Sequence, residues 1–373
     1  MANRFILNET AYFGAGCRAA LKDEVAKRGF KRALVVSDEP LVKLGIAEKV
    51  TAQLGSIPFT LFKDVKPNPT VQNVLDGVSA YKAAGADFII AVGGGSVIDA
   101  AKAIGIIIAN PNYADVVSLN GLAPTKNKSV PLIALPTTAG TAAEVTVNYV
   151  ITNENKHVKM VCVDPNTIPV LSIVDAELMM SMPAPLIAAT GMDALTHAIE
   201  GYITKAAWTL SDMFELKAIE LIANNLREAV TGKSVKAMEN LALAQYVAGM
   251  GFSNVGLGAV HSMAHPLGGQ FDIAHGVANA LLLPTVMEFN MQSCEEKYKN
   301  IAACFGVKTP KQAVEAVKKL AADIKIPGSL KQLGVPEAAL PALAKDAFAD
   351  ICTGGNPRAI TQEDMLELYK KVY

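Results

Sequence analysis

One aspartate and several histidines recur at a spacing that could build a metal site. The chain has only five histidines, and two pairs of residues four apart stand out: Asp193 with His197, and His261 with His265. Residues four apart lie on the same face of a helix. A single pair of this kind is usually a surface or capping pair. Two pairs together with His275 favour a site for a divalent transition metal, because a carboxylate and several imidazoles could meet at one point.

The segment from His261 to His275 needs a break if both ends are to reach one ion. As one unbroken helix with a rise of about 1.5 Å per residue, it would hold its ends about 21 Å apart. Metal–nitrogen bonds are only about 2.0–2.1 Å long. We expect the break at Pro266-Leu267-Gly268-Gly269. Spacing leaves open which of His261, His265 and His275 are ligands, and a histidine that is not a ligand could handle a proton.

Composition excludes several classes of function. The 373 residues are 51% hydrophobic with a formal net charge of −1. The chain is therefore long enough for two domains and not basic enough for a nucleic-acid partner. Apolar runs such as residues 103–109 are too short to span a membrane, and the N-terminal residues lack the apolar core of a signal peptide. Five cysteines without a C-x-x-C pairing indicate reduced thiols in a cytoplasmic protein.

The first half of the chain alternates β-branched runs with helical patterns. This alternation predicts an α/β domain with a mostly parallel sheet covered on both faces. The candidate strands are residues 33–37, 59–62, 88–92, 132–135 and 170–174, and the helical patterns fall at 19–28, 71–84 and 97–109. Between Asn148 and Val163, two β-rich runs flank residues 153–155 and predict a hairpin.

The pattern changes at Met182-Pro183-Ala184-Pro185, which we interpret as a domain boundary. Helical patterns dominate beyond it, beginning with residues 186–202, 211–230 and 234–249. The sequence therefore predicts an α/β nucleotide-binding domain over residues 1–182. An all-helical domain over residues 183–373 would carry the metal candidates.

Two glycine motifs could bind the phosphates of a cofactor. Residues 14–19 match G-x-G-x-x-A, but the residues before them make a poor buried strand, so this match is weak. The run Gly93-Gly94-Gly95-Ser96 instead ends a buried strand and begins a helix. Free N–H groups and the helix dipole would then face a pyrophosphate. A simple tight turn is the alternative, and we favour phosphate binding.

Two other predicted strands end in polar residues that suit a dinucleotide. Thr137, Thr138 and Thr141 follow one strand, where their hydroxyls could bind the sugar and phosphates or could simply cap a helix. Asp38 follows residues 33–37, where a carboxylate can bind ribose hydroxyls and repel a 2′-phosphate. If a dinucleotide binds, NAD(H) is preferred over NADP(H).

The chain resembles the iron-containing (group III) alcohol dehydrogenases over nearly its whole length, and within them the lactaldehyde reductase (1,2-propanediol oxidoreductase) branch. The likeness is densest in GGGS at 93–96, PTTAGTAAE at 136–144, GMDALTHAIEG at 191–201 and HSMAHPLG at 261–268. The resemblance implies a dehydroquinate synthase-like fold, in which an α/β dinucleotide-binding domain precedes an all-α metal-binding domain.

The resemblance also implies roles that spacing leaves open. It makes His265 the residue that handles the proton beside the substrate. The ligands of Fe(II), or of a similar ion such as Zn(II), would be Asp193, His197, His261 and His275. Gly94, Gly95 and Ser96 would bind the pyrophosphate and Asp38 the adenosine ribose, and the rest of the cofactor cleft would be lined by Thr137, Thr138, Thr141 and Lys159. The branch's substrate pocket matches Asn148, Phe252 and Cys352, although each is more often a packing residue.

These expectations combine into a metal-dependent, NAD-linked dehydrogenase that interconverts lactaldehyde and 1,2-propanediol by hydride transfer, as a cytoplasmic homodimer without a nucleic-acid or membrane partner. Methanol, ethanol, 1,3-propanediol and glycerol are alternative substrates, and a non-catalytic metal- and NAD-binding module is a further alternative. A lyase of the dehydroquinate synthase type would need Lys or Arg near the metal for its phosphate-bearing substrate. Residues 193–201 and 261–276 contain neither.

Overall fold

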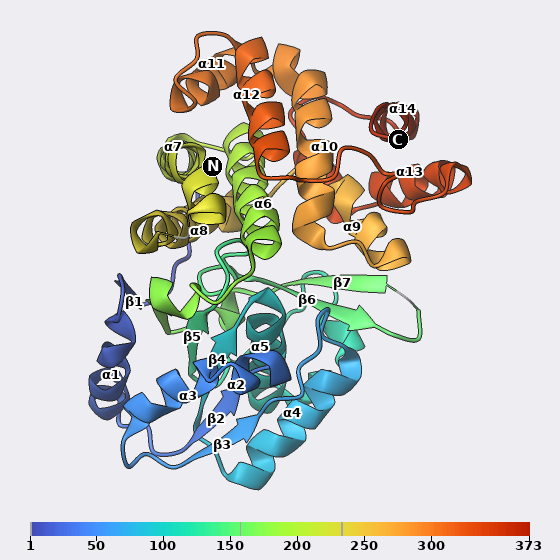
Figure 1. Ribbon diagram of the computed structural model, residues 1–373. Helices are drawn as coiled ribbons and strands as arrows, with labels where there is room; N and C mark the ends of the chain where they lie inside the picture. The colour runs from blue at the N-terminus through green and yellow to red at the C-terminus, as the bar shows by residue number, and fades with distance from the viewer. Residues whose placement is uncertain (1, 157, 233) are drawn as a thin grey trace. The chain divides into compact units, whose positions relative to one another are not determined.

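The computed structural model describes residues 2–156, 158–232 and 234–373 (Figure 1). The described chain divides into two units. One comprises Met1–Thr138 with Ala142–Ser181, and the other comprises Met182–Tyr373 with the short segment Ala139–Thr141. The first is an α/β unit and the second is helical, which confirms the predicted fold class.

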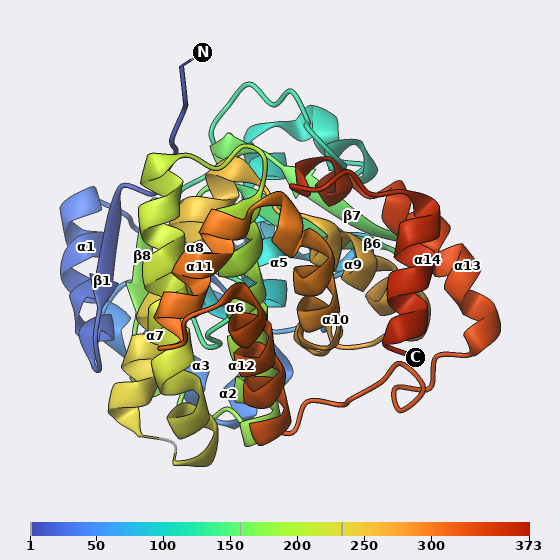
Figure 2. The same ribbon diagram turned by 90° about the horizontal axis from the view of Figure 1, so that it is seen from above.

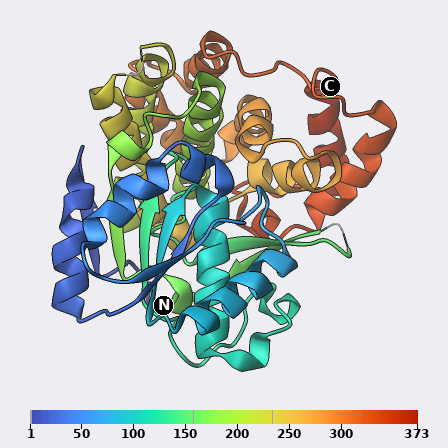
Figure 3. The same ribbon diagram turned by 60° about the horizontal axis from the view of Figure 1, so that its bottom comes forward.

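Six short strands of the first unit form one parallel sheet in the order β1-β8-β5-β4-β2-β3. Its central strands are buried along their whole length, as expected when helices cover both faces of a sheet (Figures 1 and 3). The strands are β1 (Thr10–Phe13), β2 (Ala33–Val36), β3 (Phe59–Phe62), β4 (Phe88–Gly93), β5 (Leu132–Pro136) and β8 (Leu171–Val174).

Five of these strands match the predicted runs, and β1 is the exception. The residues before Gly14 were expected to make a poor buried strand, and Thr10–Phe13 forms a half-buried strand that pairs with β8 at the edge of the sheet. An edge strand has only one neighbour and needs no continuous apolar run. The half-buried residues of β1 fit that position.

Alternate residues of each buried strand point to opposite faces of the sheet. Leu34 and Val36 of β2 face one hydrophobic core, whereas Ala33 and Val35 face another. Helices α4 and α5 cover the first core, and α1 and α3 cover the second. The helices of this unit are α1 (Ala20–Arg28), α2 (Glu39–Lys43), α3 (Ile46–Thr51), α4 (Val71–Ala84) and α5 (Gly95–Ala109).

The predicted hairpin is confirmed as β6 (Asn148–Asn153) and β7 (Val158–Val163), an antiparallel pair. The buried Lys102 and the half-buried Asp99 of α5 hold it. The Lys102 ammonium donates to the carbonyls of Thr146 and Asn148 at 2.7 and 2.8 Å, and the Asp99 carboxylate accepts from the Val150 N–H at 3.0 Å. The hairpin is thereby fixed to the helix that begins at Gly95.

Helix α6 is the centre of the second unit. It is buried from Ile187 to Ile203 except at Thr190, and α7, α8 and α10 pack against it. Helices α13 and α14 pack together near the C-terminus (Figure 2). The helices are α6 (Ala184–Ile203), α7 (Thr209–Thr231), α8 (Val235–Val255), α9 (Ala259–Phe271), α10 (His275–Asn290), α11 (Glu295–Cys304), α12 (Pro310–Asp323), α13 (Leu340–Phe348) and α14 (Gln362–Lys371).

Among the described helices, none has both the length and the apolar character needed to cross a bilayer. All five cysteines are free thiols, as the absence of C-x-x-C pairing indicated.

The predicted helix break at Pro266–Gly269 is wrong. Helix α9 continues through Pro266 to Phe271, and the chain turns at Asp272, whose φ of 53° is left-handed. A proline removes one backbone hydrogen bond but does not end a helix that tertiary contacts support. The Tyr369 hydroxyl, which donates to the Met263 carbonyl at 2.6 Å, is one such contact. The reversal needed to bring His275 back therefore lies three residues before His275.

Helix α7 buries a carboxylate that has no hydrogen-bond partner among the described residues. This is the side chain of Glu215, and neither of its oxygens has a hydrogen-bond partner among the described residues. It lies between Gly201 of α6 and Gly251 of α8. A Cβ atom at either glycine would collide with the carboxylate. Burial raises the pKa of Glu215 well above its usual range, and the charge of Asp212 adds to this effect, while Lys297 and the Phe252 amide oppose it. Glu215 therefore keeps its proton to a higher pH in the folded protein than in the unfolded chain.

This burial makes stability depend on pH. Above pH 4.5 the unfolded chain ionises Glu215 while the folded chain keeps its proton, so the free energy of unfolding falls as pH rises. The Glu215→Gln variant removes this dependence. Between pH 5 and pH 8 its free energy of unfolding should fall less steeply than that of the unmodified protein, and the two slopes should differ by up to about 1.4 kcal/mol per pH unit. Urea unfolding of both proteins at several pH values measures the two slopes.

The matched control is Glu220→Gln on the exposed side of the same helix, where the carboxylate pairs with Lys217. Its slope should equal that of the unmodified protein. Equal slopes for Glu215→Gln and the unmodified protein would show that Glu215 is ionised when buried.

Candidate metal centre

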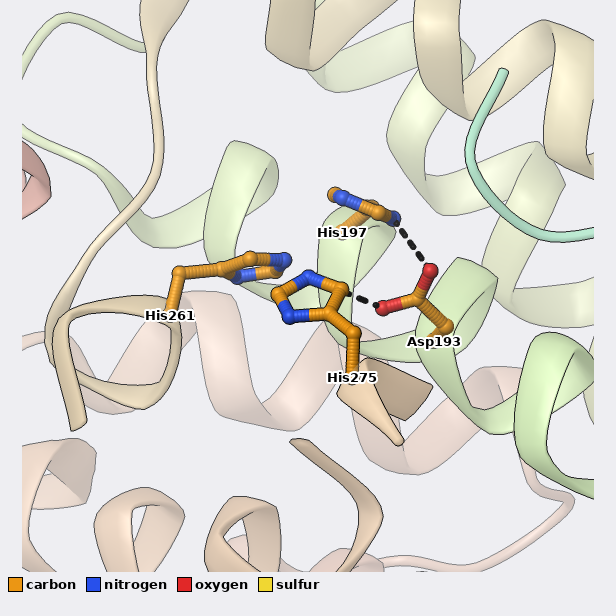
Figure 4. Close-up of side chains that lie close together, drawn as sticks. All are labelled: Asp193, His197, His261 and His275. Carbon is orange, nitrogen blue, oxygen red and sulfur yellow. Dashed lines mark ion pairs between the residues drawn. The ribbon is translucent and has the colours of Figure 1, made fainter. Parts of the chain in front are cut away.

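The four predicted metal ligands come together in the second unit. One ligand atom from each of Asp193, His197, His261 and His275 lies within 4.8 Å of the others (Figure 4). Asp193 and His197 are one turn apart on α6, His261 is in the first turn of α9, and His275 begins α10. The Asp193 carboxylate lies 3.9 Å from His197 Nδ1 and 3.6 Å from His275 Nε2.

A glycine allows α10 to begin this close to α6. A Cβ atom at Gly276 would collide with the Ala189 carbonyl of α6 and would lie 3.3 Å from Asp193 Cβ. Because Gly276 follows His275 directly, the same close approach carries the His275 imidazole to Asp193. The glycine in the HG pair at 275–276 thus has a packing role that explains its position.

A buried carboxylate positions His261. Glu200, also on α6, accepts the Val260 N–H at 2.7 Å, the His261 N–H at 3.3 Å and His261 Nδ1 at 2.6 Å. Burial raises the pKa of Glu200 to about 7, although these N–H groups pull it down. A carboxylate is favoured at a helix N-terminus, where backbone N–H groups are unpaired. Because Nδ1 of His261 carries the proton that it donates to Glu200, the lone pair of the ring is on Nε2, which faces the ligand cluster.

The buried imidazoles are in the protonation state that a metal requires. Burial lowers the pKa of His197, and it lowers that of His261 further because His197, His275 and His265 are close by. These side chains are therefore neutral at pH 7. His197 Nδ1 is buried and has no hydrogen-bond partner among the described residues. Three imidazoles, one carboxylate and an unsatisfied buried nitrogen fit a divalent transition metal.

Asn279 is a fifth polar group at this cluster. It is fully buried on α10, one turn after His275, and its Nδ2 donates to Asp193 Oδ1 at 2.7 Å. The same nitrogen lies 3.2 Å from His261 Nε2 and 3.1 Å from His275 Nε2. Asn279 was not among the predicted residues, although its spacing of four from His275 was a signal that could have identified it. The Asn279 amide nitrogen therefore lies within hydrogen-bond distance of three of the four candidate ligand side chains.

His265 lies beside the cluster and has its own carboxylate. Its Nδ1 is 2.8 Å from Asp350 Oδ2, and its ring stacks on His275 with 5.5 Å between centroids. Burial alone would raise the pKa of Asp350, but the hydrogen bond and charge of His265 bring it below its usual range. Asp350 also caps the turn Ile351–Gly355 by accepting the Cys352 N–H at 2.8 Å. No sequence pattern connects Asp350 to His265, which is 85 residues away.

Comparison with known proteins identifies the family. The chain matches the description "Iron-containing alcohol dehydrogenase" over residues 8–176 and "Fe-containing alcohol dehydrogenase family, C-terminal" over residues 187–373. It is 55% identical to the lactaldehyde reductase of Escherichia coli K12, with 99% of each chain covered. It is 41% identical to the 1,3-propanediol dehydrogenase of Citrobacter freundii, with 99% of this chain and 98% of the relative covered.

The chain belongs to the iron-containing alcohol dehydrogenase family. A solved structure, the alcohol dehydrogenase from Oenococcus oeni, superposes with a TM-score of 0.97 at 37% identity, and each chain is covered completely. The protein is therefore an oxidoreductase of this family, and the family implies NAD(H) and a divalent metal, typically iron.

The first unit of this dehydrogenase has the predicted turn for a phosphate. Gly94 caps α5 after β4, and a Cβ atom there would lie only 3.1 Å from Thr138 Cγ2. The Thr137 N–H donates to the Gly93 carbonyl at 3.0 Å, so the ends of β4 and β5 are adjacent. Gly95 and Ser96 form the first turn of α5. Thr141 belongs instead to the second unit.

Asn68 links two of the predicted cofactor residues and was not itself predicted. Its N–H donates to Ser96 Oγ at 3.3 Å, and its Oδ1 accepts from the Lys159 ammonium at 2.9 Å. Its φ of 55° is left-handed, which is uncommon outside glycine. Asp38 caps α2, with Oδ1 accepting the Leu41 N–H at 2.8 Å.

In the weak glycine motif at residues 14–19, a carboxylate of the same chain already binds the backbone N–H groups. The Gly16 and Arg18 N–H groups donate to the Asp175 carboxylate at 2.9 and 3.3 Å. These are the groups that a phosphate would need.

The three predicted pocket residues lie in different surroundings. Phe252 is buried and stacks on the metal-cluster residue His197, with 4.2 Å between centroids and 13° between planes. Cys352 lies with His265 and Asp350, and one ligand atom of each is within 4.8 Å of the others. Asn148 is in the first unit, where its carbonyl accepts from Lys102. These contacts give Phe252 a role in orienting His197.

Replacing Glu200 should weaken metal binding. Glu200→Gln keeps the shape of the side chain, but an NH₂ group replaces one accepting oxygen. This group would face an N–H donor that it cannot pair with, so His261 would be held less firmly. Loss of such an outer partner typically reduces metal affinity about 10–100-fold. Competition with a chelator measures the dissociation constant. Glu315→Gln on the exposed face of α12 is the control, and an unchanged affinity for Glu200→Gln would contradict the positioning role.

Proposed function

We propose that this dehydrogenase interconverts lactaldehyde and 1,2-propanediol with NAD(H), as a cytoplasmic homodimer. The observation that carries the proposal is the cluster of Asp193, His197, His261 and His275 with the His265–Asp350 pair beside it. The choice of substrate is supported by 55% identity to a lactaldehyde reductase over 99% of both chains. The proposed homodimer rests on family likeness, and the proposed compartment rests on the five free cysteines.

The second unit would hold the metal. Asp193, His197, His261 and His275 would bind Fe(II), with Zn(II) as the alternative ion, because imidazole and carboxylate ligands accept both. When bound, the ion supplies Lewis-acid activation of the substrate oxygen, and NAD supplies the hydride acceptor. Glu200 and Asn279 hold the ligand atoms in place before the ion arrives.

The first unit would hold NAD(H). Gly94, Gly95 and Ser96 offer backbone N–H groups and a hydroxyl at the N-terminus of α5, where an anion is favoured. Asp38 would bind the adenosine ribose through the oxygen that does not cap α2. The remaining contacts would come from Thr137, Thr138, Thr141 and Lys159.

His265 would move the proton of the reaction. In alcohol oxidation the carbon-bound hydrogen leaves as hydride and the hydroxyl hydrogen leaves as a proton. With Nδ1 hydrogen-bonded to Asp350, His265 can accept that proton on its other ring nitrogen. The Asp350 carboxylate then stabilises the imidazolium, and in aldehyde reduction the same pair returns the proton.

The substrate pocket would be formed by Asn148, Phe252 and Cys352. One amide, one aromatic ring and one thiol suit a short aldehyde with a neighbouring hydroxyl group. Activity on 1,3-propanediol is a second candidate, which the 41% identity to a 1,3-propanediol dehydrogenase favours.

A substrate panel tests this proposal. Protein purified without oxygen is loaded separately with Fe(II) and Zn(II), and NADH oxidation is followed with lactaldehyde, glycolaldehyde, 3-hydroxypropanal and simple alkanals. We expect metal-dependent oxidation of NADH that is fastest with lactaldehyde. Best activity on 3-hydroxypropanal would favour the second candidate. Absence of turnover with full metal occupancy would contradict both and favour a non-catalytic metal- and NAD-binding module.

Two classes of variant separate the proton-handling residue from the ligands. His265→Ala should lower kcat by about 10²–10⁴-fold, the usual contribution of general acid–base catalysis, while metal content stays at the unmodified level. Asp193→Ala and His197→Ala should lose the metal. Elemental analysis after gel filtration, together with steady-state rates, measures both effects. Loss of metal from His265→Ala would show that His265 is a ligand.

A further inference from the structure

A second group of possible metal ligands lies next to the first and has no assigned role in holding an ion. His265, Asp350 and Cys352 each present one ligand atom, and these atoms lie within 4.8 Å of one another. The three side chains are partly exposed, so an ion could reach them. His265 comes from α9, while Asp350 and Cys352 flank the start of the turn Ile351–Gly355. The backbone of that turn is fixed by the bond from the Cys352 N–H to Asp350.

The chemistry of this trio differs from that of the four-residue cluster. An imidazole, a carboxylate and a thiolate are all ligands of Zn(II), and three protein ligands with a water in the fourth position are a common zinc arrangement. The thiolate favours a soft ion, whereas the cluster of three imidazoles and a carboxylate also suits Fe(II). The thiolate therefore gives the trio a preference for thiophilic ions that the four-residue cluster does not share.

We propose that the trio His265, Asp350 and Cys352 is a separate binding site for Zn(II) or another thiophilic divalent ion. Occupation of this site inhibits the iron-loaded enzyme. Binding of the ion at the trio does not depend on the proposed reaction. Inhibition rests on the proposed role of His265, because an ion on its Nδ1 displaces the hydrogen bond to Asp350 that orients the imidazole.

Proton balance gives the proposal a measurable consequence. Burial, with a further contribution from the nearby Asp350, raises the pKa of the Cys352 thiol well above its usual range, so the thiol is protonated without an ion. Binding breaks the S–H bond and forms a metal–sulfur bond, which releases one proton to solvent. Each ion bound at the trio therefore releases the proton of the Cys352 thiol.

The experiment titrates Zn(II) into Fe(II)-loaded protein without oxygen, in the presence of a reductant that does not bind metals. After gel filtration we expect one iron and one zinc per chain, and a fall in NADH oxidation that follows the zinc content. In Cys352→Ser the zinc should bind at least about 10–100-fold more weakly, the range known for loss of even an outer partner. Cys304→Ser is the matched control, because this half-buried thiol faces the Leu216 carbonyl, away from both clusters.

Co(II) gives a readout specific to sulfur ligation. Added to the iron-loaded protein, it should produce a thiolate-to-cobalt charge-transfer band in the unmodified protein and in Cys304→Ser but not in Cys352→Ser. If Cys352→Ser does not fold, Asp350→Asn supplies the same test of zinc affinity.

Three results would overturn the site. The first is replacement of iron by zinc, one for one. The second is zinc binding to Cys352→Ser as tight as that to the unmodified protein. The third is a charge-transfer band that persists in Cys352→Ser. Zinc bound at the trio without inhibition would support the site and contradict the proposed role of His265, so the two failures can be told apart.

Discussion

The close approach of α9 and α10 to α6 is the constraint on which the metal centre depends. Each helix contributes ligands that reach only a few ångströms, so the helix backbones must come nearer than ordinary side chains allow. Gly276 makes this possible for α10, because any larger residue would strike the Ala189 carbonyl. Glu200 makes it possible for α9, because its buried carboxylate replaces water as the partner of the Val260 and His261 N–H groups.

The same packing sets the electrostatics of the site. Helices that touch exclude water, and exclusion of water lowers the pKa values of His197 and His261 so that both are neutral. Neutral imidazoles offer lone pairs but attract one another only weakly, so the metal-free cluster needs donors to hold it. The Asn279 amide nitrogen donates to Asp193 and lies within hydrogen-bond distance of His261 Nε2 and His275 Nε2. The fold thus gathers the candidate ligands around one point and keeps the His197 and His261 imidazoles neutral.

The sequence predicted the parts of this arrangement that local patterns determine. Strand β4, the glycine turn after it and α5 follow from a buried run that ends in GGGS, and the hairpin follows from two β-rich runs of equal length. The candidate ligands were indicated by spacing on helices and specified by family resemblance, and the structure brings one ligand atom of each within 4.8 Å of the others. The position of the reversal between α9 and α10 was not predictable from local preference, because Pro266 is a helix breaker that tertiary contacts override.

What local patterns could not predict are the partners that arrive from distant segments. Glu200 and Glu215 show this most clearly. Both are buried glutamates of the second unit. Glu200 lies within the GMDALTHAIEG run, but neither residue was given a role from the sequence. Glu200 meets the free N–H groups at the start of α9 and orients a ligand. Glu215 lies against two glycines, and the nearby Phe252 amide does not offset the effect of burial, which raises its pKa. Residue type and burial are the same in the two cases, so the role of each is set by which backbone groups the neighbouring helix presents, and these are determined only when the helices pack.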